Sequence, residues 1–165
     1  AFGDAMQNLR ERLLVAPIML QVRAGRPVLG ICLGMQLLFQ ESDELGRHTG
    51  LGVFPGRVVR FPQASNCSGN GDGRLRVPHV GWNELHLRRQ NALLRGVKPD
   101  SYAYFVHSYY VRPTDPSLVL ASTDYGIDFA SVVGRANLFG AQFHPEKSQQ
   151  TGMLMLRNFV QLCGE

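Results

Sequence analysis

The hydrophobic residues of this chain follow helical spacing near its start and strand-like spacing through most of its second half. Helical spacing predicts a first helix over residues 5–14, with Asp4 as its N-cap. A second helix is expected to open near Pro17 and to stop at Gly25, because proline suits a first helical turn and glycine suits a helix end.

The pattern then changes to short apolar segments. An apolar run over residues 28–31 predicts a strand, and helical spacing follows over residues 35–41. The further strands are expected at residues 57–61, 84–87, 102–106, 118–122, 131–135 and 138–142. A last helix is predicted from its cap Ser148 to about Leu162, and the polar, glycine-rich residues 63–74 read as a surface loop.

This order of elements predicts the α/β class, with a mixed open sheet flanked by helices in a single domain over residues 1–165. An open α/β sheet normally has strands before a strand such as 28–31, and none precede it here. We therefore expect that the first one or two βα units are missing from this chain.

The composition is that of an ordinary globular domain, with 44% hydrophobic and 18% charged residues and a net charge of +4. The arginines are scattered, so no nucleic-acid partner is predicted, and no apolar run reaches membrane-spanning length. The three cysteines are widely spaced, which argues against a disulfide framework and favours a reducing, cytoplasmic location. No metal or other cofactor is predicted, and Cys67 is assigned no chemistry.

Cys32 lies where the apolar strand meets the following helix, between Gly30 and Gly34. A sharp strand-to-helix turn lifts a nucleophile out at the edge of a sheet. We expect both glycines to be required, because a side chain on either side would crowd the turn. A helix N-terminus beneath the sulfur favours the reactive thiolate, whereas the alternative is a buried cysteine acting as a small hydrophobic residue.

His144 and Glu146 follow the strand predicted over residues 138–142. Residues two apart in extended chain point to the same side, so Glu146 is expected to orient the imidazole. His144 could then take the proton from Cys32, completing a nucleophile–base–carboxylate triad. The alternative is a structural histidine near a strand end.

Two segments, Gly-Ile-Cys-Leu-Gly-Met-Gln at 30–36 and Gln-Phe-His-Pro-Glu at 142–146, resemble class I glutamine amidotransferases. Residues 78–83 and 104–110 are similar to the glutaminase subunits of imidazole glycerol phosphate synthase, and so are residues 1–6 and 144–148. The resemblance covers nearly the whole chain apart from residues 63–74, which look like an insertion. It implies the flavodoxin-like fold of these amidotransferases.

The resemblance implies hydrolysis of L-glutamine to glutamate and ammonia by Cys32, His144 and Glu146. The ammonia would pass to a cyclase partner, a (βα)8 barrel, that makes imidazole glycerol phosphate for histidine synthesis. The Leu33 amide is the natural first oxyanion donor. The second donor comes from a loop that precedes the segment matching Ala1, so half of the oxyanion hole is expected to be absent.

Family position also implies the residues that contact substrate and partner. Gln36 and Glu44 are candidates to contact the α-amino and α-carboxylate groups of glutamine. The alternative for Gln36 is an ordinary helix-surface residue, and the alternative for Glu44 is a solvated loop charge. Ser108 and Tyr109 are candidates for main-chain contacts. His107 is expected to be an interior histidine satisfied by hydrogen bonds, in preference to a base.

Three residues are expected to face the cyclase. A short turn around Trp82 and Asn83 would present the indole ring near the rim of the site, and Tyr104 would lie beside the ammonia exit. The alternatives are a core tryptophan and a strand tyrosine packed in the sheet.

Other functions remain open at this point. One is a related amidotransferase that serves another acceptor, in the pyridoxal phosphate or nucleotide pathways. Another is a non-catalytic binding fragment that keeps the fold. A cysteine peptidase could also use the sharp strand-to-helix turn at Cys32, called the elbow below, although no substrate-cleft pattern supports this function.

Overall fold

A computed structural model describes residues 1–62 and 75–164, so the segment predicted as a loop over residues 63–74, with Cys67, lies outside the described residues. The helices are α1 (Phe2–Glu11), α2 (Val15–Arg23), α3 (Leu33–Leu37) and α4 (Gln149–Cys163), with short 3-10 turns η1 (Pro116–Leu118) and η2 (Pro145–Lys147). The strands are β1 (Val28–Ile31), β2 (Phe39–Ser42), β3 (His48–Thr49), β4 (Phe54–Arg60), β5 (His79–Leu87), β6 (Ser101–His107), β7 (Tyr109–Pro113), β8 (Val119–Asp124), β9 (Asp128–Arg135) and β10 (Leu138–Ala141). No helix in these two ranges is both long enough and apolar enough to cross a membrane.

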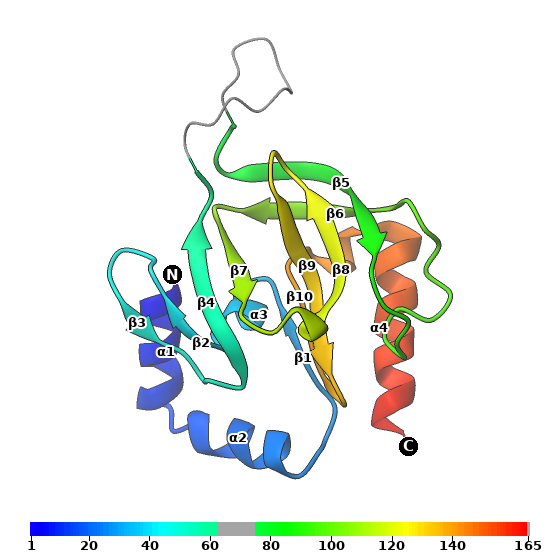
Figure 1. Cartoon of the computed structure of the whole chain (residues 1–165). Helices are drawn as coiled ribbons and strands as arrows, with labels where there is room; N and C mark the ends of the chain where they lie inside the picture. Colours follow the sequence, from blue (N-terminus) through cyan, green and yellow to red (C-terminus); the bar gives the residue numbers. More distant parts are fainter. Residues whose placement is uncertain (63–74, 165) are drawn as a thin grey trace.

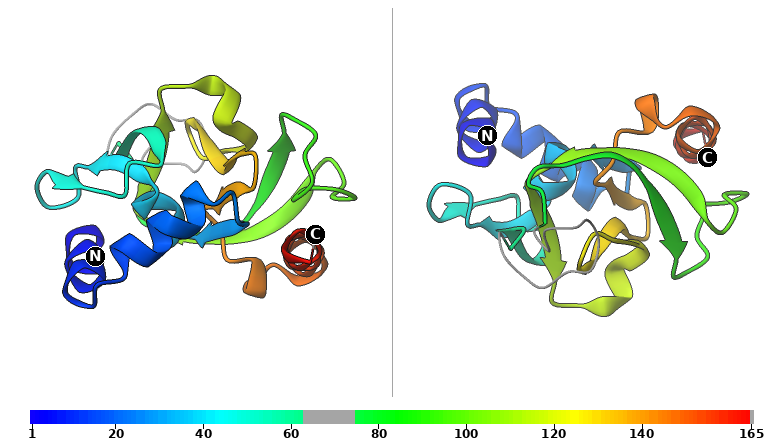
Figure 2. Two further views of the ribbon diagram at one scale, coloured as in Figure 1. Left: turned by 90° about the horizontal axis from the view of Figure 1, so that it is seen from below. Right: turned by 90° about the horizontal axis from the view of Figure 1, so that it is seen from above.

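The strands form two sheets (Figure 1). A six-stranded sheet has the order β1-β10-β9-β8-β5-β6, and a four-stranded sheet has the order β3-β2-β4-β7. β5 and β6 pair as a long curved ribbon (Figure 2). Both sheets combine parallel and antiparallel pairs, which confirms the predicted mixed α/β architecture.

Two hydrophobic clusters hold these elements together. One joins α4 to the large sheet through Met155, Phe105 and Phe129. The other packs α1 and α3 against the smaller sheet through Phe2 and Met35. Complete burial of a phenylalanine or methionine side chain contributes about 1.5–3 kcal/mol, so both clusters fix the elements that carry the site.

The strand predicted over residues 28–31 coincides with β1, and the strands predicted in the second half overlap β5, β6, β8, β9 and β10. Gly25 has a positive φ of 69° just after α2, as expected for a helix stop. The predicted cap Asp4 is wrong, because α1 already begins at Phe2 and Asp4 lies in its first turn.

The helix predicted over residues 35–41 is also wrong. α3 ends at Leu37, and residues 39–42 form β2, which pairs with β3 and β4. Backbone pairing with two strands outweighs the helical spacing, since propensity is readily overridden by tertiary context.

Candidate active site

The elbow at Cys32 has the strained backbone expected of a nucleophile turn. Cys32 has φ of 51° and ψ of −108°, a combination that residues with a side chain rarely adopt. A Cβ added to Gly30 would lie 2.5 Å from the carbonyl oxygen of Gly34, so Gly30 is required. The expectation for Gly34 is wrong, because a Cβ added there would meet nothing within 4 Å.

Parallel pairing of β1 with β10 brings the second half of the site to the elbow. Ile31 lies opposite Ala141, and the Cys32 amide donates to the Ala141 carbonyl at 2.7 Å. The C-terminal ends of the two strands therefore lie at the same edge of the sheet. Cys32 leaves β1 at this edge, and the segment that carries His144 leaves β10 there.

The predicted contact between His144 and Glu146 is confirmed: His144 Nδ1 lies 2.7 Å from Glu146 Oε1. The local backbone differs from the expectation, because residues 145–147 form the turn η2 in place of extended chain. The Ser148 hydroxyl donates to the His144 carbonyl at 2.7 Å and so stabilises this turn, although it makes no cap bond to α4. The His144 amide also donates to the Tyr104 carbonyl at 3.0 Å, which ties the turn to β6.

The electrostatics of the site differ at its two ends. Burial raises the pKa of the Cys32 thiol, against the lowering effects of the Leu33 amide and the Gln142 side chain. The Leu33 amide at the start of α3 thus favours the thiolate, as expected, but burial outweighs this effect and leaves the pKa of the thiol raised. Burial pushes the pKa of Glu146 upward, but its own backbone amide and His144 together outweigh burial and lower the pKa. Glu146 is thus a carboxylate at neutral pH.

A pocket of about 300 Å³ opens beside Cys32. Its walls include all the residues to which the sequence assigned oxyanion or substrate contacts, namely Leu33, Gln36, Glu44, Ser108 and Tyr109. Pro78, Val106 and His107 are further lining residues, whereas His144 and Glu146 are not on this wall. A volume of this size suits a small polar metabolite such as an amino acid.

Two of the wall residues are held by internal hydrogen bonds. The Gln36 amide is 5% exposed and donates to the Tyr109 carbonyl at 3.0 Å and to Gln142 Oε1 at 3.1 Å. Gln36 is therefore not an ordinary helix-surface residue. The Glu44 side chain is 15% exposed, and its Oε2 accepts from the Phe2 amide at 2.7 Å, so Glu44 is not a freely solvated loop charge.

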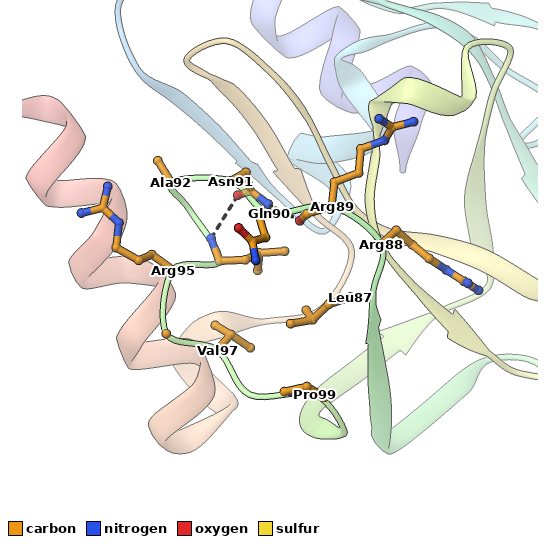
Figure 3. Close-up of a pocket in the computed structure, with 11 residues that line it drawn as sticks. Leu87, Arg88, Arg89, Gln90, Asn91, Ala92, Arg95, Val97 and Pro99 are labelled. Carbon is orange, nitrogen blue, oxygen red and sulfur yellow. Dashed lines mark hydrogen bonds between the residues drawn. The ribbon is translucent and has the colours of Figure 1, made fainter.

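A larger cavity of about 740 Å³, lined by residues 87–92, 94–97 and Pro99, contains no cysteine (Figure 3). Arg88, Arg89 and Arg95 point away from one another in this view, so they do not converge on a bound anion. Arg88 pairs instead with Asp128 at 2.9 Å. The chemistry therefore belongs to the smaller pocket.

One group in the described ranges has the residue types of a metal site. Ligand atoms of Glu84, His86 and Asp100 lie within 4.8 Å of one another at the surface. A hydrogen bond to Asp100 is the main cause that raises the pKa of Glu84. None of these residues lines the Cys32 pocket.

The residues expected at a partner interface lie on the β5–β6 ribbon. Trp82 is opposite Tyr104, with ring centroids 5.9 Å apart, and the indole is 47% exposed. The predicted turn is wrong, because residues 79–87 form one strand. The expectation that Asn83 faces the partner together with Trp82 is also wrong, because Asn83 points to the opposite face and its side-chain amide donates to the Asp124 carbonyl at 2.8 Å.

His107 is an interior histidine, as expected, with one ring nitrogen bonded to the Tyr109 carbonyl and the other to His79. Sequence reasoning assigned no role to His79 or Gln142, although Gln142 Nε2 lies 3.8 Å from Cys32 Sγ. The signal that could have found Gln142 is its position one residue beyond the strand that pairs with β1.

Comparison with known proteins agrees with this geometry. The family model for glutamine amidotransferase class-I matches residues 10–162. The imidazole glycerol phosphate synthase subunit HisH of Geobacillus kaustophilus is 53% identical over 160 residues, which are 97% of this chain and 74% of that protein. The HisH subunit of Syntrophotalea carbinolica is 50% identical over 159 residues, with shares of 96% and 76%.

Solved structures support the fold. A structure described as glutamine amidotransferase has a TM-score of 0.65 at 22% identity and covers 95% of this chain and 71% of its own. A glutamine amidotransferase from Thermotoga maritima has a TM-score of 0.62 at 15% identity, with shares of 98% and 58%. The chain therefore belongs to the class I glutamine amidotransferases and, within them, to the family of HisH subunits of imidazole glycerol phosphate synthase.

Proposed function

We propose that this chain is the glutaminase subunit of an imidazole glycerol phosphate synthase and acts in histidine biosynthesis. The observation that carries the proposal is the pocket that holds Cys32, the Leu33 amide and the four residues expected to contact glutamine. HisH relatives that are about 50% identical over nearly the whole chain support the same conclusion.

The raised pKa of Cys32 defines what the reaction needs. A thiol that stays protonated at rest requires a general base at the moment of attack. Because Nδ1 of His144 donates to the Glu146 carboxylate, the lone pair of Nε2 remains free to accept the Cys32 proton. Glu146, ionised at neutral pH, orients the ring and stabilises the imidazolium that forms.

The proposed steps follow from these roles. The sulfur of Cys32 bonds to the side-chain carbonyl carbon of glutamine, and the oxyanion accepts from the Leu33 amide. His144 returns its proton to the amide nitrogen, the C–N bond breaks, and ammonia leaves. Water, deprotonated by His144, then cleaves the thioester to give glutamate and restore the Cys32 thiol.

We propose that ammonia passes to a cyclase subunit that binds the exposed face of the β5–β6 ribbon, giving a cytoplasmic heterodimer. This docking face consists of Val80, Trp82, Tyr102, Tyr104 and Val106. Its large side chains Trp82 and Tyr102 are about half exposed, at 47% and 53%. Val106 also lines the Cys32 pocket, so the face and the pocket adjoin. An exposed apolar face of this kind is typical of a protein interface.

The decisive experiment is Cys32→Ala in the complex with the cyclase. We expect glutamine-dependent product formation to be lost and formation from added ammonium salts to persist. Loss of both would mean that Cys32 serves the fold or the interface and would refute the proposed role. A glutamine-like electrophile should label Cys32 and spare the exposed Cys163, which serves as an internal control.

Trp82→Ala tests the docking face. A buried interface tryptophan is commonly worth about 2 kcal/mol or more, so we expect at least a tenfold weaker complex with unchanged stability of the free chain. Leu20→Ala is the matched control, because Leu20 is 63% exposed on α2, which lies at the opposite end of the molecule from β5 and β6 (Figure 1). Equal effects of the two substitutions would place the interface elsewhere.

A further inference from the structure

A chain of hydrogen bonds runs through the protein interior from β5 to the carbonyl of Tyr109. The Asn83 side-chain amide lies 3.2 Å from His79 Nε2. His79 Nδ1 lies 3.0 Å from His107 Nε2, and His107 Nδ1 lies 2.8 Å from the Tyr109 oxygen. Both imidazole rings are buried, at 3% and 6% exposure.

The groups at the two ends of this series of hydrogen bonds determine which atom donates in each bond. The Tyr109 carbonyl only accepts, so His107 must carry its proton on Nδ1. At the other end, Asn83 Oδ1 accepts from the Glu84 amide and its NH₂ group donates to the Asp124 carbonyl. The amide nitrogen of Asn83 therefore faces His79, and His79 Nε2 must accept.

The two constraints agree on one arrangement. Asn83 donates to Nε2 of His79, Nδ1–H of His79 donates to Nε2 of His107, and Nδ1–H of His107 donates to Tyr109. A second proton on either ring would set two N–H groups against each other. Burial, the largest cause, lowers the pKa of His79 to about 3 and that of His107 to about 4, so both rings are neutral at physiological pH.

The Tyr109 carbonyl connects this series of hydrogen bonds to the surroundings of Cys32. It also accepts from Gln36 Nε2 at 3.0 Å, and the same amide group donates to Gln142 Oε1 at 3.1 Å. Orienting the Gln142 oxygen toward Gln36 leaves its NH₂ group to face Cys32 Sγ, at 3.8 Å. This donor is one of the groups that lower the pKa of the thiol against burial.

We propose that His79 and His107 are positioning residues for Cys32, held as neutral rings protonated on Nδ1. They fix the Tyr109 carbonyl and, through Gln36, the Gln142 amide that donates to the sulfur. Their contribution to turnover rests on the function proposed above. The tautomers and the effect on the thiol do not depend on that function.

The first test is the tautomer of each ring, measured on the full chain by long-range ¹⁵N–¹H correlation spectra of the imidazoles at neutral pH. We expect Nδ1 protonated and Nε2 unprotonated in both rings. This is discriminating, because free neutral histidine favours the Nε2–H form. A ring that is charged or protonated on Nε2 would overturn the proposal. Because this measurement uses the unaltered protein, a variant that fails to fold does not weaken it.

The second test is the pH dependence of Cys32 alkylation. His107→Phe keeps a ring of similar size but removes both hydrogen bonds, so the alkylation profile should move to higher pH and kcat for glutamine should fall about tenfold or more, with little change in KM. His107→Asn retains an N–H group near the position of Nδ1. It should therefore bring both the alkylation profile and kcat most of the way back to their wild-type values. His86→Phe is the control on the same strand, because His86 is outside the chain of hydrogen bonds and should change neither.

The outcomes separate this inference from the proposed function. A folded His107→Phe protein with the wild-type alkylation profile would refute positioning. If the wild-type protein has the expected tautomers and His107→Phe shows the expected shift of the alkylation profile, but the wild-type protein has no glutaminase activity in the presence of its cyclase, the function is refuted and the positioning role remains.

Discussion

The structure of the elbow predicts opposite effects on stability when its two glycines, Gly30 and Gly34, are replaced by alanine. In Gly30→Ala, the new Cβ would lie 2.5 Å from the Gly34 carbonyl oxygen and 2.7 Å from the Met35 amide nitrogen. These are backbone atoms of the turn, so they cannot move aside as a flexible side chain would. In Gly34→Ala, the new Cβ enters open space within α3.

The magnitudes follow from these surroundings. Overpacking of a tight site costs about 1–3 kcal/mol, and the rigid neighbours of Gly30 put its substitution at the upper end. Alanine in place of a helical glycine gains about 0.5–1 kcal/mol, so Gly34→Ala should be neutral or slightly stabilising. The two variants should differ by about 3 kcal/mol, which corresponds to ~6–12 °C in Tm for a domain of this size.

The assay is urea unfolding of both variants, with Tm as a second measure, followed by glutaminase activity in the complex. A displacement of the nucleophile by 1 Å can cost about a hundredfold in rate, so Gly30→Ala should also lose most of its activity. If Gly34→Ala destabilises the chain as much as Gly30→Ala does, the close approach at Gly30 is not what shapes the elbow, and the reasoning fails.

Three further predictions concern the rest of the site. Gly152→Ala would drive a Cβ into the Pro145 carbonyl, so it should cost about 1–3 kcal/mol in urea unfolding and reduce activity, whereas Gly164→Ala, with its nearest contact at 3.5 Å, should do neither. Because the pKa of Glu146 is lowered, its carboxylate stabilises the fold above the unfolded pKa of about 4.3, and this contribution is lost in acid. The difference in stability between the wild type and Glu146→Gln should therefore vanish as pH falls. A difference that stays constant with pH would contradict this prediction. The two buried histidines bind protons more weakly than in the unfolded chain, so stability should fall as pH drops from about 6.5 toward 4, by roughly 2 kcal/mol for each histidine at pH 5 and therefore about 4 kcal/mol for the two. This slope should be shallower in His107→Asn when unfolding is followed at several pH values.

The parts of the site that the sequence predicts correctly depend on local geometry. β1, the turn at Cys32 and the contact between His144 and Glu146 each involve residues close in the chain. The grouping of Gln36, Glu44, Ser108 and Tyr109 with Cys32 rests on resemblance, not on spacing, and the pocket supports it.

The parts that failed depend on distant partners. Residues 39–42 carry a pattern that fits a helix, and only pairing with β3 and β4 makes them a strand. β7 was missed although it pairs with β4 over five residue pairs. The raised pKa of Cys32 reflects burial, which no local motif contains. The hydrogen bond between Gln36 and Gln142 spans 106 residues of sequence and follows from the neighbouring ends of β1 and β10.

β5 connects the proposed docking face with the interior chain of hydrogen bonds, because successive residues of a strand point to opposite sides. Val80 and Trp82 face outward, opposite Val106 and Tyr104, whereas His79 lies opposite His107 on the inner side. The pairing is continuous from His79 to Leu85 without a shift. A slip of one residue would turn the inward-facing histidine to solvent and the tryptophan to the core at once. The register of β5 on β6 therefore determines the interface and the neighbourhood of Cys32 together, and neither can be altered at the level of the backbone without the other.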